Sequence, residues 1–293
     1  MKDYLVKAYA FDGTVRIYSA STTMLVEEAR VIHDTWPAAT AALGRTLTAS
    51  VIMGAMYKED QTLSIRIDGG GPIGKIMTTT NAHGEVRGFV SNPHVHMSTN
   101  AGKLAVGHVV GNNGFIHVTK DVKIRETFTS SASLQTGEIA EDFTYYFAKS
   151  EQIPSSVGLG VLVADDNSVI ASGGFILQIM PGCTEETLSL IEENIKSMKP
   201  VSELIHLGLT PEEVVQELTK GNHEFVQKMD LHYACDCSKE RFARGLISLG
   251  EKELEEMIQA GETIETTCHF CGKEYHFDIE ELKELKHITE KVS

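Results

Sequence analysis

The sequence lacks the features that would identify a membrane, secreted or nucleic-acid-binding protein. Its 293 residues contain no run of about 20 apolar residues, so we expect no transmembrane helix and no membrane partner. The first residues, MKDYLVKAYAFDG, carry Asp3 early and lack the long apolar stretch of a signal peptide, so we expect a cytoplasmic protein. The net charge is -15 and no basic patch occurs, which opposes nucleic-acid binding.

The chain also lacks the motifs of nucleotide-binding and hydrolytic enzymes. Its glycine-rich segment at 69–74 has no lysine-serine ending and no following helical pattern, so it predicts a hairpin turn that needs positive φ, and no phosphate loop. Ser156 and Ser172 do not complete a G-x-S-x-G elbow. We therefore expect no nucleotide partner and no enzymatic activity.

Residues 1–180 predict a mixed α/β layered domain of the α+β class. Paired strands, turn residues and inserted helical patterns favour such a layer fold. The expected helices span about 23–57, broken at Pro37, and about 139–151. The expected strands lie in 2–11 and 14–21 around Asp12-Gly13, in a hairpin over 62–80, near 85–90, 106–110 and 115–119, and in a hairpin over 157–180.

Pro181-Gly182 marks the clearest boundary in the chain. After it the strand signal disappears for about 50 residues, and residues 181–230 predict a metastable helical linker. Thr184 is placed to cap one helix, and Thr210 begins a capping box before a second that ends at Gly221. Isolated helices this short are marginally stable in water, so they need a surface on which to dock.

Residues 231–293 predict a small C-terminal domain of different composition. This segment and the preceding linker each carry a net charge of -6, against -3 for the first 180 residues. Ser238 is placed to cap a helix, and Asp278 with Glu281 forms a further capping box. Four of the five cysteines also lie in this segment, in two close pairs.

The two cysteine pairs predict one zinc ion per chain. Cys235-Asp236-Cys237 and Cys268-His269-Phe270-Cys271 are separated by 30 residues, and zinc takes four thiolates from two such pairs. Gly272 lets the backbone turn around the metal. Because four thiolates complete the tetrahedron, the nearby histidines and the fifth cysteine are interpreted as surface or packing residues: His232, His269, His276 and Cys183.

Other interpretations of the cysteines stay open. Spacing alone does not exclude a permanent structural zinc, for example in a protein-binding adaptor. A zinc enzyme is disfavoured because a catalytic zinc keeps an open coordination position. Four free core cysteines would leave the two close pairs unexplained.

The energetics make a redox switch plausible. Zinc-bound cysteines are thiolates, the form that oxidants attack, and oxidation to disulfides removes the ligands. Structural zinc supplies about 10–16 kcal/mol, whereas whole domains are stable by about 5–15 kcal/mol. We hypothesise that oxidation unfolds the C-terminal segment, undocks the helices of 184–220 and exposes apolar surface that binds unfolded proteins.

The sequence resembles the bacterial redox-regulated chaperones, the 33-kDa heat-shock chaperonins. The resemblance rests on C-D-C and C-H-F-C near the C-terminus and on four further segments: IDGGGPIG at 67–74, GNNGFIHVTKD at 111–121, YYFAKSEQIPS at 145–155 and GGFILQIMPG at 173–182. It implies an N-terminal α/β domain, a metastable helical linker and a C-terminal zinc domain. It also implies that the reduced, zinc-bound protein is inactive.

The same resemblance implies how activation proceeds. Oxidants form the disulfides Cys235–Cys237 and Cys268–Cys271, and zinc is released. The chain then dimerises and holds unfolding or oxidatively damaged proteins without ATP, as a response to oxidative and heat stress.

Overall fold

The computed structural model describes residues 2–58, 61–95, 97, 104–121 and 127–292. It divides into two compact units, Met1–Ala234 and Cys235–Ser293. None of the helices in the described part is both long and apolar enough to cross a membrane.

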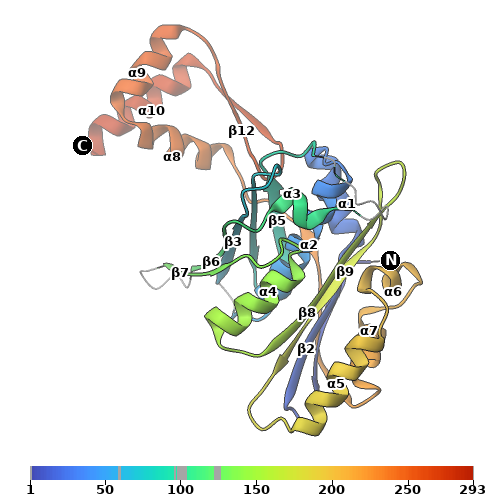
Figure 1. Ribbon diagram of the computed structural model, residues 1–293. Helices are drawn as coiled ribbons and strands as arrows, with labels where there is room; N and C mark the ends of the chain where they lie inside the picture. The colour runs from blue at the N-terminus through green and yellow to red at the C-terminus, as the bar shows by residue number, and fades with distance from the viewer. Residues whose placement is uncertain (1, 59–60, 96, 98–103, 122–126, 293) are drawn as a thin grey trace. The chain divides into compact units, whose positions relative to one another are not determined.

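The first unit contains a five-stranded antiparallel sheet (Figure 1). Its order is β10-β1-β2-β9-β8. A tight turn joins β1 and β2 as a hairpin, and Phe11, Asp12 and Gly13 all have positive φ in it. The strands are β1 (Tyr4–Ala10), β2 (Val15–Ser21), β8 (Ser155–Val163), β9 (Val169–Ile179) and β10 (His223–Asp230).

A second, six-stranded sheet has the order β11-β5-β4-β3-β6-β7. The glycine-rich segment 69–74 joins two neighbouring antiparallel strands of this sheet, β3 and β4. Gly70 and Gly74 have positive φ there, and no helix follows. The predicted hairpin is therefore confirmed. The strands are β3 (Thr62–Asp68), β4 (Lys75–Asn81), β5 (Glu85–Val90), β6 (Phe115–Asp121), β7 (Thr127–Ser133) and β11 (His232–Tyr233).

Helix α2 (Pro37–Gly54) forms the middle layer of this unit, since it packs against strands of both sheets. Its sequence is rich in alanine, glycine and threonine, which lets the two sheets approach it closely, and it is buried along nearly its whole length. The other helical elements of residues 1–180 are α1 (Thr23–His33), α3 (Val106–Val110), α4 (Ala140–Tyr146) and a π-helical turn, η1 (Phe147–Glu151).

Three further helices follow β9 in the chain: α5 (Glu185–Ser197), α6 (Val201–His206) and α7 (Pro211–Thr219). Helices α6 and α7 pack against the five-stranded sheet, and α5 packs against α7. Their apolar residues share a buried cluster with β1, β2 and β9, separate from the core around α2. Thr184 accepts a hydrogen bond from Thr187 N, and Thr210 and Glu213 complete the expected capping box. The helices predicted after residue 181 are therefore confirmed.

A polar cluster ties α7 to this sheet. The Tyr4 hydroxyl donates to Glu212 Oε2 at 2.5 Å, and Lys228 Nζ pairs with Glu212 Oε1 at 2.9 Å. Lys228 Nζ also lies 3.9 Å from the centroid of the Tyr4 ring, within cation–π range. The first turn of α7 is thus held to β1 and β10 by a set that we call the α7 latch: Tyr4, Glu212 and Lys228.

The second unit has three helices and a two-stranded hairpin: α8 (Lys239–Leu249), α9 (Glu251–Ala260), β12 (Ile264–Thr267), β13 (Glu274–Phe277) and α10 (Ile279–Val292). Ser238 caps α8, and the box of Asp278 and Glu281 precedes α10 as predicted. In the described part of this unit the buried apolar cluster consists of Leu246, Leu254, Phe277 and Leu282, with partly buried side chains packed around it. At about 1.5–3 kcal/mol for each buried side chain, this core is small.

The α+β class and the layered arrangement are confirmed, but two predictions about local structure were wrong. Residues 106–110 form helix α3, not a strand, and their first turn closes on the carbonyl of Ala105. The strand signal also does not vanish after residue 181, because β10 lies in 223–230 and pairs with β1. The three-part division at 180 and 230 stays a prediction.

Candidate metal centre

The four cysteines of the two pairs come together within the second unit. Their sulfur atoms all lie within 4.8 Å of one another. Cys235 Sγ and Cys268 Sγ are 3.7 Å apart, and Cys237 Sγ and Cys271 Sγ are 3.3 Å apart. Thiolates at about 2.3 Å from a tetrahedral zinc would be separated by about 3.8 Å. The cluster therefore has the size of a four-thiolate metal site.

A tight turn shapes the second half of the site. Cys268 N donates to Lys273 O at 2.9 Å, while Cys271 N and Gly272 N both donate to Cys268 O. Gly272 has φ +70, which a residue with a side chain adopts at a cost. The turn joins β12 to β13 and directs the two sulfurs to the same side, as the spacing predicts.

The hydroxyl of Tyr275 on β13 supports the first half of the site. It donates to Cys237 O at 3.0 Å and lies 3.2 Å from Cys237 Sγ. The Tyr275 ring stacks on Phe242 of α8, with centroids 4.9 Å apart. Tyr275 thus joins the hairpin, helix α8 and one thiol of the cluster.

The thiols differ in acidity. Burial raises the pKa of Cys271 to about 12 and also raises that of Cys235. Burial acts the same way on Cys237, but hydrogen bonds from Tyr275 and the neighbouring thiols outweigh it and lower its pKa to about 7. Cys237 is therefore more readily ionised than Cys235 and Cys271, and the form that attacks an oxidant is the thiolate.

The site is reachable from solvent. Cys268 is buried, but the other three cysteines are half-exposed. The cluster therefore lies near the surface of the unit and not deep in its core.

The remaining candidates from the sequence lie elsewhere. In the described part of the chain, the group of close metal-ligating atoms contains the four thiols and no histidine. His276 Nδ1 lies 3.4 Å from Glu265 Oε1, and His232 belongs to β11 of the first unit. Cys183 is half-buried against the cluster beneath α5–α7, which fits its interpretation as a small apolar residue.

The donor set fits zinc. Four soft thiolate sulfurs in a roughly tetrahedral group suit zinc or an iron–sulfur cluster, and hard cations prefer oxygen. Sequence reasoning identified the four sulfurs but missed Tyr275. Its aromatic side chain in the strand-like segment after Gly272 was the only available signal.

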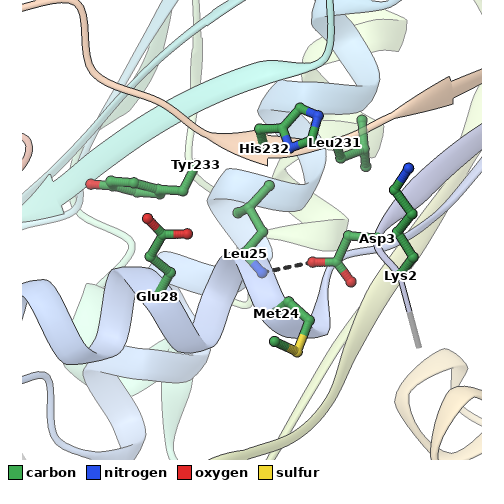
Figure 2. A pocket seen from close by; sticks show the side chains of 8 residues that line it. All are labelled: Lys2, Asp3, Met24, Leu25, Glu28, Leu231, His232 and Tyr233. Atoms are coloured by element: carbon green, nitrogen blue, oxygen red, sulfur yellow. Dashed lines mark hydrogen bonds between the residues drawn. The ribbon is translucent and has the colours of Figure 1, made fainter.

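A cavity of about 450 Å³ in the first unit is the other polar site of note (Figure 2). It surrounds Asp3, whose Oδ2 accepts from Leu25 N at 2.6 Å in the first turn of α1. The second oxygen, Oδ1, is buried and has no hydrogen-bond partner among the described residues. Burial raises the Asp3 pKa to about 6, against the opposing effect of the helix N–H groups. The other ionisable residues that line the cavity are Lys2, Glu28, His232 and Tyr233.

Comparison with known proteins gives the family. The model of the family described as Hsp33 protein matches residues 3–278. The chain belongs to the Hsp33 family. Among relatives of this family, the 33 kDa chaperonin of Geobacillus kaustophilus is 53% identical over 293 residues, covering 99% of this chain and 100% of the relative. That of Bacillus subtilis is 50% identical over 288 residues, covering 98% and 99%.

The fold agrees with that assignment. The crystal structure of the 33 kDa chaperonin from Thermotoga maritima superposes with a TM-score of 0.92 at 35% identity, over 99% of this chain and 100% of the other. The resemblance inferred from the sequence is confirmed, and this Hsp33-family chain is a chaperone by the names of its relatives.

Proposed function

We propose that this chain is a redox-regulated holdase that binds unfolding proteins without ATP. The observation that carries the proposal is the cluster of four thiols in a unit whose own apolar core is small. Membership of a chaperone family supports the binding of unfolded proteins as the activity. Regulation follows if the stability of the second unit depends on the thiol cluster.

Cys235, Cys237, Cys268 and Cys271 would hold one zinc ion in the reduced chain. When bound, zinc would keep the four sulfurs together and contribute about 10–16 kcal/mol to folding. Four buried apolar side chains at about 1.5–3 kcal/mol each contribute no more than that. The unit then depends on its thiolates as much as on its core.

Oxidation would proceed in two balanced steps for each disulfide. A thiolate of the cluster attacks hydrogen peroxide and becomes a sulfenic acid, and the released hydroxide takes up a proton to form water. A second thiol then displaces water and forms the disulfide. Each disulfide uses one peroxide and yields two waters, so two peroxides oxidise the cluster.

We propose the pairing Cys235–Cys237 and Cys268–Cys271, which joins near neighbours in the sequence. The short sulfur distances in the reduced cluster run between the pairs, so proximity alone does not select this pairing over Cys235–Cys268. Peptide mapping of the oxidised chain distinguishes the two.

Loss of the thiolates would unfold the second unit and release α5–α7 from the sheet. The cluster beneath these helices includes Ile17, Phe175 and Val215, and it would become available to unfolded or oxidatively damaged clients. We further propose that the activated chain forms a homodimer.

One experiment tests the activity. Zinc-loaded chain is treated with peroxide under mild unfolding conditions while zinc release, free thiols and suppression of client aggregation are followed together. We expect the three to change in parallel. Zinc release without any gain in holding activity would instead favour an adaptor with a permanent structural zinc.

A further inference from the structure

The two sheets of the first unit leave four edge strands: β10 and β8 in one, β11 and β7 in the other. An edge strand presents unpaired N–H and C=O groups to which another chain can add. Folded proteins block such edges with charges, proline, bulges, short strands or covering groups. The four edges differ in how far they are blocked.

Three edges carry such features. Strand β10 is charged, with Glu224, Lys228 and Asp230, and its pairing with β1 is interrupted by a bulge. Strand β11 has two residues. On β7, the carbonyls of Ser131 and Ser133 accept hydrogen bonds at 3.0 Å from Ser150 Oγ and Gln135 Nε2.

Strand β8 lacks the charges, the proline and, up to Leu162, the bulge that would block an edge, although helices α4 and α6 pack against it. Its nine residues, SSVGLGVLV, contain no charge and no proline, and its register with β9 is regular up to Leu162. Long, uncharged edges of this kind are normally avoided because they invite strand addition.

The direction of the β8 backbone groups follows from one hydrogen bond. Ile179 N donates to Pro154 O at 2.9 Å, so these two residues face each other through their backbone groups. Because the pattern alternates along an antiparallel ladder, the N–H and C=O groups of every second residue point away from β9. These outward residues are Ser155, Val157, Leu159 and Val161.

The outward groups are available over the first half of the strand. Within the described residues, no hydrogen bond outside the ladder with β9 reaches the backbone of β8. Ser155 through Leu159 are half-exposed, whereas Gly160 and Val161 are buried. Helix α6 packs there, so closely that a Cβ built on Gly160 would lie 2.7 Å from Ser202 Cβ.

We propose that the outer edge of β8 binds an extended segment of an unfolded polypeptide by strand addition. The occupant follows from the hydrogen-bonding pattern, because alternating N–H and C=O groups at strand spacing are matched by another extended backbone. Main-chain recognition does not depend on client sequence, which suits a chaperone. Release of α6 would extend the open edge through Val161.

The inference rests on the proposed holdase activity, and its test separates the two. Oxidised chain is mixed with a reduced, carboxymethylated protein that cannot refold, and amide hydrogen exchange is measured at single residues. We expect exchange at Ser155, Val157 and Leu159 to slow by about tenfold or more when the client is bound.

The other results are decisive as well. Bound client with unprotected β8 amides would overturn the β8 assignment and leave the holdase activity standing. Absence of client binding would overturn the proposed function itself. Protection that needs no client and grows with chain concentration would show that the edge pairs with a second copy, which also overturns the assignment.

A substitution gives an independent readout. Val157→Pro removes one outward N–H and no ladder hydrogen bond, and proline is tolerated on edges in this position. Val157→Ala is the matched control that keeps the N–H. We expect the proline variant alone to bind client about tenfold more weakly. Urea unfolding followed by the fluorescence of Trp36 checks that both variants fold like the parent. If they do, equal client binding by the two variants would contradict the proposal. If the proline variant fails to fold, the exchange measurement decides.

Discussion

Tyr275 is the residue whose hydroxyl acts most directly on the thiol chemistry. Tyr275→Phe keeps the stacking on Phe242 and removes the hydrogen bond to Cys237. We expect the pKa of Cys237 to rise from about 7 towards that of an ordinary thiol, because its thiolate loses a donor. Zinc affinity should fall about tenfold, as for other groups that support metal ligands.

The measurement is the pH dependence of zinc competition by a chelator in the reduced, zinc-loaded chain, because zinc binding requires each thiol to be deprotonated. Thr266→Ser, which keeps the hydroxyl that bonds the backbone of Tyr275, serves as the control in the same hairpin. An unchanged pH profile of zinc affinity in the phenylalanine variant would show that the hydroxyl does not tune Cys237.

Asp3 gives a pH dependence to the stability of the first unit. Its pKa is about 6 in the folded chain, against about 3.9 for an unfolded aspartate. The folded chain therefore holds this proton more tightly, and the contribution of Asp3 to the free energy of unfolding increases as pH falls from 6 to 4. The increase is about 3 kcal/mol at most.

Asp3→Asn keeps an acceptor for Leu25 N and cannot ionise, so it should remove this increase. Urea unfolding followed at Trp36, the single tryptophan, reports on the first unit across this pH range. Asp12→Asn, in the exposed β1–β2 turn, is the control. A difference between parent and Asp3→Asn that stays constant with pH would refute the assignment.

Single residues were predictable where their role depends on local sequence. Gly272 and the capping residues Thr184 and Ser238 act within a few positions of their partners. The four cysteines were predictable because each pair is itself a short local motif, although their sulfurs meet across 33 and 34 positions. Tyr275 was not predictable, because its hydroxyl reaches a thiol 38 residues away. Asp3 likewise caps a helix that begins 20 residues later.

At the scale of elements, we expect the α7 latch to set how firmly helices α5–α7 dock. Burial alone would raise the pKa of Glu212, but hydrogen bonds from Tyr4 and Lys228 outweigh it and lower the pKa. Glu212→Gln removes the charge that Lys228 pairs with. We expect opening of residues 185–219 to become easier by about 1–2 kcal/mol, since the group is partly exposed.

Amide hydrogen exchange of α5–α7 in the reduced, zinc-loaded chain measures this change. Glu217→Gln is the matched control on the same helix, because its pair with Lys220 is exposed and lies within one turn. Equal exchange in both variants would mean that apolar packing alone docks α7.

Elements with a clear period were predicted and those without one were missed. Strand β10 is an edge strand that pairs with β1, and its residues are exposed at most positions. Its sequence therefore lacks the apolar alternation that predicts a strand. Strand β7 is similarly polar, with one buried side chain. For residues 106–110 the error was the reverse, a strand predicted where none forms. Their valines are typical of a strand, but they pack into the core from a short helix.

For the whole molecule, the proposal is that thiolate–metal bonds supply much of the folding energy of the second unit. Zinc removal or oxidation then affects a unit whose buried cluster has four apolar side chains among its described residues, whereas the first unit keeps its two large clusters. The sequence predicted this imbalance through the spacing of the cysteines and the few apolar residues around them. It could not indicate that α2 lies between two sheets, because that arrangement depends on contacts distant in sequence.

Hydrogen exchange of α8, α9 and α10 tests this account most directly, comparing the reduced, zinc-loaded chain with the oxidised, zinc-free chain. The account predicts strong protection in the first and near-complete loss in the second, with α2 protected in both. Helices α8–α10 that stay equally protected after oxidation and zinc loss would contradict it.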